Sequence, residues 1–176
     1  MPRFSQFSRS LFAAAFATSL FAAGPVLSAG EGAPTLSVGD AFPAFELQDQ
    51  FEEARAVPGE AALVIFSGSK DADDTLSETL GEVAGEALRA GEIIYLSDIS
   101  RMPGLITRFV AMPALKDRDY PVTLIREEGM AEALPATDGC YTLYTLGAGT
   151  IEGIDEICEP AALRSTLTGQ APAAND

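Results

Sequence analysis

Two short apolar runs, each followed by a helical pattern, restrict the fold of this chain more than any other feature. The run from Glu60 to Phe66 predicts a buried strand, and the run from Glu92 to Ser97 predicts a second one. Between them, from Thr75 to Arg89, apolar residues recur at the spacing of one helical face. Two strands joined through a helix pair in parallel, so the sequence predicts an α/β protein.

The second half of the chain extends this pattern. A helix is expected from near Pro103, a strand over residues 120–125, and a closing helix over residues 160–167. A β-hairpin, with strands at 140–146 and 150–157, is expected to turn at Gly147–Gly149. The predicted fold is a mixed central sheet with helices on both faces and a C-terminal hairpin plus helix. The apolar residues of the helix after Pro103 are expected on its buried side: Leu105, Ile106, Phe109, Val110 and Met112.

The first residues predict export. Arg3 and Arg9 precede a continuous apolar run that ends in small residues, which is the pattern of a secretory signal peptide cleaved near Ser28 or Ala29. The alternative is an uncleaved membrane anchor, but the apolar run is short for a span, and no later segment is long enough. We therefore expect a signal peptide (1–29), a flexible lead-in (30–40), one domain (41–169) and a disordered tail (170–176). The expected location is the periplasm, with the extracellular space as the alternative.

Charge and composition exclude several classes of function. The formal net charge of −15 opposes binding to nucleic acid and to anionic lipid headgroups. The chain contains no histidine, which excludes Ser-His-Asp and Cys-His triads and histidine-based metal or haem sites. No G-x-G-x-x-G motif joins a strand to a helix, so a dinucleotide cofactor is not expected. We expect no cofactor and no structural metal.

Cys140 and Cys158 are the two cysteines of the chain, and they flank the predicted hairpin. Because the hairpin strands run back beside each other, the two side chains could meet within disulfide distance. A disulfide that fastens the hairpin is the favoured interpretation. A redox-active pair and two unbonded thiols are the alternatives.

Several motifs together resemble the thioredoxin-like fold, and particularly its peroxiredoxin-like branch (alkyl hydroperoxide reductase/thiol-specific antioxidant). Gly39, Pro43, Phe45, Leu47 and Asp49 match the G-x-x-x-P-x-F-x-L-x-D lead-in of that branch. AALVIFSGS resembles the strand that leads to the active turn, YPVTLIREEGMAEALP resembles the next strand and helix, and CYTLYTLGAGTIEGI resembles the closing hairpin. The resemblance implies a three-layer sandwich over most of the chain.

The turn that carries the redox cysteines in such proteins lacks them here. The two cysteine positions of a thioredoxin-type turn fall on Lys70 and Asp73, and the peroxidatic position falls near Thr75. None supplies a thiolate, the nucleophile of this chemistry. The candidate degenerate active-site turn consists of Ser67, Ser69, Lys70, Asp71, Asp73, Asp74 and Thr75.

The residues of this turn have plainer interpretations as well. Asp73 or Asp74 is expected to cap the following helix, and a cation site with Asp71 is a lesser alternative. Neighbouring aspartates should keep Lys70 protonated, which makes it a poor nucleophile.

Asp98 and Arg101 follow the second strand, where ligands bind in open α/β sheets, so they are candidates for a small-molecule cleft or for a helix cap. The sequence favours a non-catalytic binding or accessory protein of the cell envelope, with an unknown protein or small-molecule partner. The alternative is an oxidoreductase that uses Cys140 and Cys158 or a bound cofactor.

Overall fold

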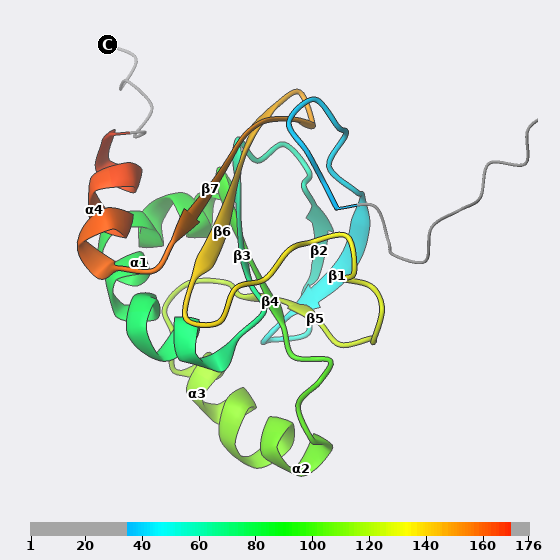
Figure 1. The fold of residues 1–176 in the computed structure, drawn as a ribbon. Helices are drawn as coiled ribbons and strands as arrows, with labels where there is room; N and C mark the ends of the chain where they lie inside the picture. The colour runs from blue at the N-terminus through cyan, green and yellow to red at the C-terminus, as the bar shows by residue number, and fades with distance from the viewer. Residues whose placement is uncertain (1–34, 170–176) are drawn as a thin grey trace, which may run out of the picture. The chain divides into compact units, whose positions relative to one another are not determined.

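The computed structural model describes residues 35–169 of the protein. The predicted signal peptide, the start of the lead-in and the predicted disordered tail (170–176) lie outside the described residues. In chain order (Figure 1) the elements are β1 (Phe45–Asp49), β2 (Ala54–Val57), β3 (Leu63–Ser67), α1 (Lys70–Ala90), β4 (Ile93–Asp98), α2 (Gly104–Ile106), the π-helix η1 (Thr107–Ala111), α3 (Met112–Lys116), β5 (Thr123–Ile125), β6 (Tyr141–Gly147), β7 (Thr150–Ile157) and α4 (Pro160–Gly169).

The strands form one mixed seven-stranded sheet in the order β2-β1-β5-β4-β3-β6-β7. The three central strands β5, β4 and β3 are parallel, as two β-α-β crossovers require. The β6–β7 hairpin adds to the β3 edge, and β1 with β2 adds to the β5 edge, all antiparallel. The α/β class, the mixed sheet and the C-terminal hairpin with its helix are thus confirmed.

The two faces of the sheet bury separate apolar clusters. On one face, α1 packs on β3 and β4, α4 packs on α1 and β7, and α3 adds to the same cluster, with Leu76, Leu115 and Leu163 among the buried side chains. The other face is covered by the stretch before β1, through Phe42, and by the loop before β6, through Leu134. Between residues 35 and 169, none of the helices combines the length and the hydropathy that a bilayer-spanning segment requires.

The stretch before β1 is tied to the hairpin by backbone hydrogen bonds. The amide of Gly39 donates to the carbonyl of Ile151 (2.8 Å), and the amide of Phe42 donates to that of Gly149 (2.9 Å). β2 was not predicted, because its four residues, ARAV, carry only one buried side chain, Val57. It nevertheless pairs with β1 along its whole length.

The start of α1 differs from the expectation. The helix begins at Lys70, five residues earlier than predicted, and its N-cap is Ser69, whose Oγ accepts a hydrogen bond from the amide of Ala72 (3.4 Å). The prediction that Asp73 or Asp74 caps the helix is therefore wrong. Ser69 has an extended backbone and a short oxygen-bearing side chain, which is what an N-cap requires.

The helical segment after Pro103 also differs, in the side that it buries. Leu105, Phe109 and Val110 were expected in the core, but 74, 66 and 52% of their surfaces are exposed, and Ile106 is exposed as well. A π-helical turn contains more residues than an α-turn, so η1 rotates the residues after it relative to those before. Met112, by contrast, is half-buried and packs against the core.

Candidate functional site

The carboxyl ends of the parallel strands meet at one edge of the sheet. Ser67 at the end of β3 lies beside Ser97 of β4, and Asp98 of β4 lies beside Ile125 of β5. Open α/β sheets bind ligands at this edge. The turn from Ser67 to Asp74 and the predicted pair Asp98 and Arg101 both belong to it.

Ser69 connects the turn with the segment that leads into β6. Besides capping α1, its Oγ accepts a hydrogen bond from the amide of Gly139 (3.1 Å), 70 residues along the chain. The hydroxyl of Ser67 donates to the carbonyl of Ser69 (3.1 Å). The hydroxyls of Ser67 and Ser69 therefore stabilise the backbone conformation of the turn.

Asp73 points inward from the first turn of α1 into a group of tyrosines. Its Oδ1 accepts hydrogen bonds from the hydroxyls of Tyr95 and Tyr141 (3.2 Å for Tyr141), and the two hydroxyls lie 3.3 Å apart. Burial raises the pKa of the Asp73 carboxyl, and the nearby Arg118 guanidinium opposes part of that rise. Burial also raises the pKa of Tyr141, so its hydroxyl is a neutral donor to this carboxyl.

Arg118 closes this group from the side of α3. Its guanidinium carbon lies 5.8 Å from the ring centre of Tyr95 and 5.9 Å from that of Tyr120, within cation–π distance. Its Nη1 is buried and has no hydrogen-bond partner among the described residues. Asp73, Tyr95, Tyr141, Tyr120 and Arg118, here called the tyrosine cluster, therefore form an enclosed polar group beneath the turn.

The rest of the turn faces solvent. Lys70 forms an i,i+4 ion pair with Asp74, and this hydrogen bond is the main cause that raises the pKa of the Lys70 ammonium. Asp71 and Thr75 are exposed. Because Asp73 points inward and Asp74 pairs with Lys70, the aspartates of the turn do not converge on a common cation position.

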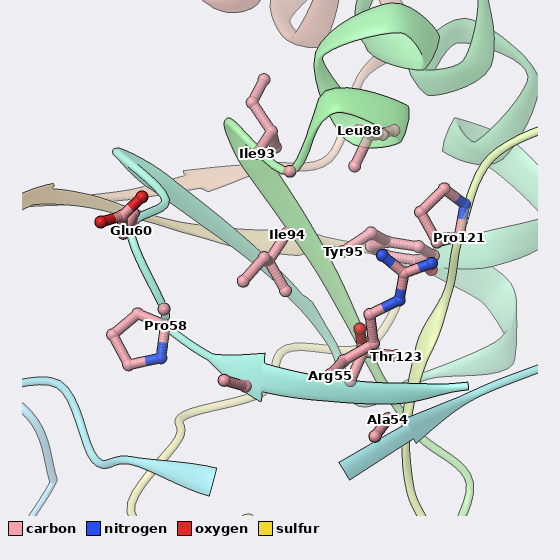
Figure 2. A pocket seen from close by; sticks show the side chains of 13 residues that line it. Ala54, Arg55, Pro58, Glu60, Leu88, Ile93, Ile94, Tyr95, Pro121 and Thr123 are labelled. Carbon is pink, nitrogen blue, oxygen red and sulfur yellow. The ribbon is translucent and has the colours of Figure 1, made fainter. Parts of the chain in front are cut away.

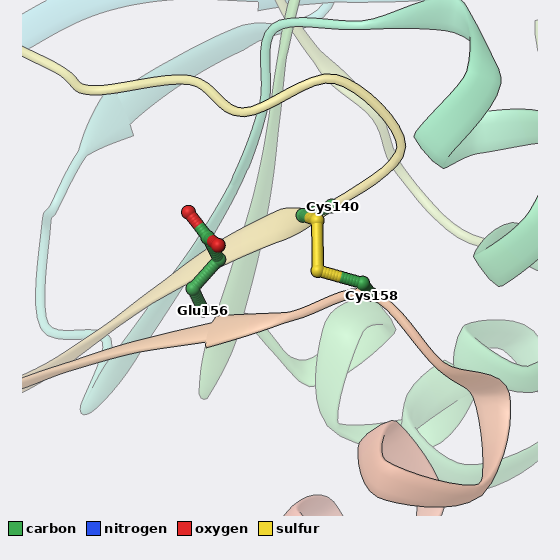
Figure 3. A group of neighbouring side chains, drawn as sticks. All are labelled: Cys140, Glu156 and Cys158. Atoms are coloured by element: carbon green, nitrogen blue, oxygen red, sulfur yellow. A yellow bond between two sulfur atoms is a disulfide. The ribbon is translucent and has the colours of Figure 1, made fainter.

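The predicted disulfide is present between Cys140 and Cys158 (Figure 3), with an Sγ–Sγ distance of 2.00 Å and a Cα–Cα distance of 4.1 Å. It continues the hairpin pairing by one position beyond Tyr141 and Ile157. Cys140 is buried and Cys158 is exposed. Cys158 lies two residues before α4, which begins at Pro160 as predicted.

A carboxylate lies beside the bridge. An oxygen of Glu156 and the two sulfur atoms all lie within 4.8 Å of one another. Two sulfurs joined to each other are not thiolates, so the oxidised group offers a metal ion no thiolate ligand. The carboxylate also disfavours thiolate formation after reduction, because like charges repel.

Asp98 and Arg101 line a hollow of about 350 Å³, and the acidic side chains of Glu128 and Glu132 share it. Asp98 Oδ1 also accepts a hydrogen bond from the amide of Ser100 (2.9 Å), which holds the start of the following loop. The hollow lies at the expected sheet edge, but Ser67 to Asp74 do not line it. The structure therefore brings Asp98 and Arg101 together without joining them to the turn.

Another hollow, of about 280 Å³, lies between β2 and the amino end of β4 (Figure 2). Its basic side chain, Arg55, is held 3.0 Å from the fully buried carboxylate of Asp49. This ion pair links β2 to the end of β1, so the Arg55 side chain stabilises the β1–β2 connection.

The tyrosine cluster was missed by sequence reasoning. Tyr95 and Tyr141 were assigned to strands but not to a site, and Arg118 was not singled out. No local motif marks them, because their contacts with Asp73 span 22 to 68 residues of chain.

No protein-family model matches the sequence, and no curated protein sequence matches it. Among solved structures, the protein is similar to a proposed protein disulfide isomerase from Bacteroides thetaiotaomicron, with a TM-score of 0.52, 10% identity, and coverage of 76% of this chain and 87% of the other. It also matches a thio-disulfide isomerase from Thermus thermophilus (TM-score 0.48, 18% identity, 78% and 100% coverage) and a peroxiredoxin-like protein from Aquifex aeolicus (0.43, 15%, 78% and 89%).

At such low identity the comparison bears on the fold alone. Together with the strand order, it agrees with the resemblance found in the sequence. The protein has a thioredoxin-like fold in which Cys140 and Cys158 form a disulfide in the closing hairpin, and the turn before α1 carries no cysteine pair.

Proposed function

We propose that the protein is an exported binding or accessory protein of the cell envelope, and that it catalyses neither thiol–disulfide exchange nor peroxide reduction. The observation that carries this proposal is the position of Asp73. In the alignment to a thioredoxin-type turn it takes the place of the second cysteine, and its carboxyl is hydrogen-bonded to Tyr95 and Tyr141.

The chemistry of the turn supports a non-catalytic role. Thiol exchange and peroxide reduction both begin with attack by a thiolate, which a helix N-terminus stabilises. At the start of α1 the chain offers a protonated lysine, Lys70, and an inward-facing carboxyl, Asp73. Neither group can form a mixed disulfide or a sulfenic acid.

The disulfide supports the same role. It joins the ends of β6 and β7, and the carboxylate of Glu156 beside it opposes the thiolate that exchange would need. A bridge of this kind fastens the hairpin.

The test is a pair of turnover assays on the purified chain, insulin reduction with a thiol donor and consumption of hydrogen peroxide. The Cys140→Ser/Cys158→Ser variant is the control, since it has no thiol. We expect equal rates for the two proteins in both assays. A rate for the unmodified protein that clearly exceeds the control would overturn the proposal.

One observation favours a second candidate, a thiol oxidoreductase that uses Cys140 and Cys158. Cys158 is exposed, and Cys140 follows Gly139, whose amide binds the cap residue Ser69, so the bridge lies near the usual site of this chemistry. Equilibration with glutathione buffers, followed by thiol trapping and mass measurement, separates the two candidates. A bridge that opens only under strongly reducing buffers supports the structural role, whereas one that exchanges within the range of catalytic dithiols supports the second candidate.

Export is the part of the proposal that rests on the N-terminal sequence, with Arg3, Arg9 and the apolar run that follows. Expression in a Gram-negative host and fractionation test it. We expect a processed chain in the periplasmic fraction, and an unprocessed chain in the cytoplasm would contradict it.

A further inference from the structure

A third hollow at the carboxyl edge of the sheet differs from the rest of this acidic protein in its charge. It measures about 570 Å³, and its lining residues come mainly from the α2–η1–α3 segment and from the chain that follows β4 and β5. Arg108, Lys116 and Arg126 line it, and the acidic side chain among its lining residues is Glu52. Its volume is in the range of small-molecule sites.

The basic residues of this region are not used for ion pairs. The described cations that form ion pairs are Arg55, Lys70, Arg89 and Arg164. Within residues 35–169, Arg108, Lys116 and Arg126 have no acidic partner within ion-pair distance, although the chain has more than twice as many acidic as basic residues. With three cations and one carboxylate, Glu52, the lining of the hollow carries a net positive charge, and salt screens its effect beyond about 8 Å.

The same hollow has an apolar wall and an apolar rim. Ile99, Met102 and Met112 contribute to its lining. Beside it, Phe109 is largely exposed, and the Arg108 guanidinium lies 5.5 Å from its ring centre. Methionine side chains adapt to ligands of varied shape.

From these features we infer that the hollow binds an amphiphilic anion, a small molecule with a carboxylate or phosphate group and a hydrocarbon chain. The acid group would lie among Arg108, Lys116 and Arg126, and the hydrocarbon would lie against Met102 and Met112. The carboxyl edge of β4 and β5 is the ligand-binding edge of this type of sheet, which supports the same assignment. The neighbouring hollow with Asp98, Glu128 and Glu132 is acidic and would repel such a ligand.

The inference rests on the binding role proposed above, but the two fail by different measurements. Turnover of thiols or peroxide would refute the role, whereas the titrations below test the hollow.

Decanoate, titrated into the purified chain by calorimetry, is the probe. We expect saturable binding that weakens for hexanoate, because less hydrocarbon is buried, and that weakens with added NaCl. The Lys116→Gln/Arg126→Gln variant should bind decanoate at least about tenfold more weakly, which corresponds to about 1.4 kcal/mol. Both side chains are exposed, so the variant should fold, and circular dichroism checks this.

Arg89→Gln/Arg164→Gln is the matched control, because it removes the same charge from ion pairs away from the hollow. It should bind decanoate as the unmodified chain does. No saturable binding of decanoate, or equal losses in both variants, would overturn the inference.

Vesicles separate the free amphiphile from a membrane surface. Binding to vesicles that contain phosphatidylglycerol, without binding of decanoate, would overturn the small-molecule site in favour of a lipid surface. Decanoate binding without vesicle binding is the expected result.

Discussion

The tyrosine cluster and the basic hollow lie at the same edge of the sheet but use their charged groups in opposite ways. Around the cluster, Asp73 and Ser69 are hydrogen-bonded to partners from other elements. Arg108, Lys116 and Arg126 line the hollow and form no ion pair with an acidic side chain among the described residues. Under the proposals made above, the usual active position of this fold serves as framework in this chain, and ligand binding takes place at the hollow beside the ends of β4 and β5.

Substitutions in the two regions should have different effects. Substitutions at the turn and the hairpin should change stability, and substitutions in and around the hollow should change binding but leave stability nearly unchanged.

Loss of the disulfide should have the largest effect. Cys140→Ser/Cys158→Ser removes a constraint on an 18-residue separation, and we expect the free energy of unfolding to fall by about 3 kcal/mol. Urea denaturation measures it. Reductant should destabilise the unmodified chain by a similar amount and leave the variant unaffected. A reductant effect on the variant would show that the loss does not come from the bridge.

Tyr141→Phe tests whether the tyrosine cluster contributes to stability. The substitution removes one hydrogen bond to the Asp73 carboxyl, and we expect a loss of about 1 kcal/mol in urea denaturation. Tyr144→Phe is the matched control on the same strand, because the buried Tyr144 hydroxyl has no partner among the described residues. The control should be neutral or slightly stabilising, and an equal loss in both variants would contradict the role of the Asp73 bond.

Asp73→Asn should change how stability depends on pH. Burial raises the folded-state pKa of Asp73 above its ordinary value of 3.8, so the folded state binds this proton more tightly than the unfolded state. The protonated Asp73 carboxyl therefore contributes to the free energy of unfolding at pH values below the ordinary pKa of 3.8, and this contribution is lost as the pH rises through the folded-state pKa. Because asparagine cannot ionise, the variant should gain stability relative to the unmodified chain over this range, and the gain should then stay constant.

Urea denaturation at a series of pH values, from below the ordinary pKa of aspartate to neutrality, measures the effect. Asp71→Asn removes a carboxylate from the exposed side of the same turn and controls for the change in net charge. A stability difference for Asp73→Asn that does not vary with pH would refute the interpretation.

The sequence could predict what depends on local pattern. The apolar runs correctly predicted β3 and β4, and the two cysteines that flank the hairpin correctly predicted the disulfide between Cys140 and Cys158. The cap at Ser69 was missed, because the aspartates that follow it are equally good cap residues and only the backbone distinguishes them. The exposure of Leu105 could not be predicted, because periodicity shows which residues share a helical face but not whether that face lies against the core or against solvent.

Leu105→Ala should have the smallest effect on stability, and Leu115→Ala in the same helical segment is its counterpart. Leu105 is 74% exposed, whereas Leu115, ten residues later, is 5% exposed and belongs to the core. The same substitution should therefore cost less than about 0.5 kcal/mol at Leu105 and about 2 to 5 kcal/mol at Leu115. If Leu105→Ala proved as costly as Leu115→Ala, the segment would bury both sides, and the apolar rim of the hollow would not be available to a ligand. If Leu105→Ala left stability unchanged but weakened decanoate binding, the hydrocarbon chain would also contact Leu105.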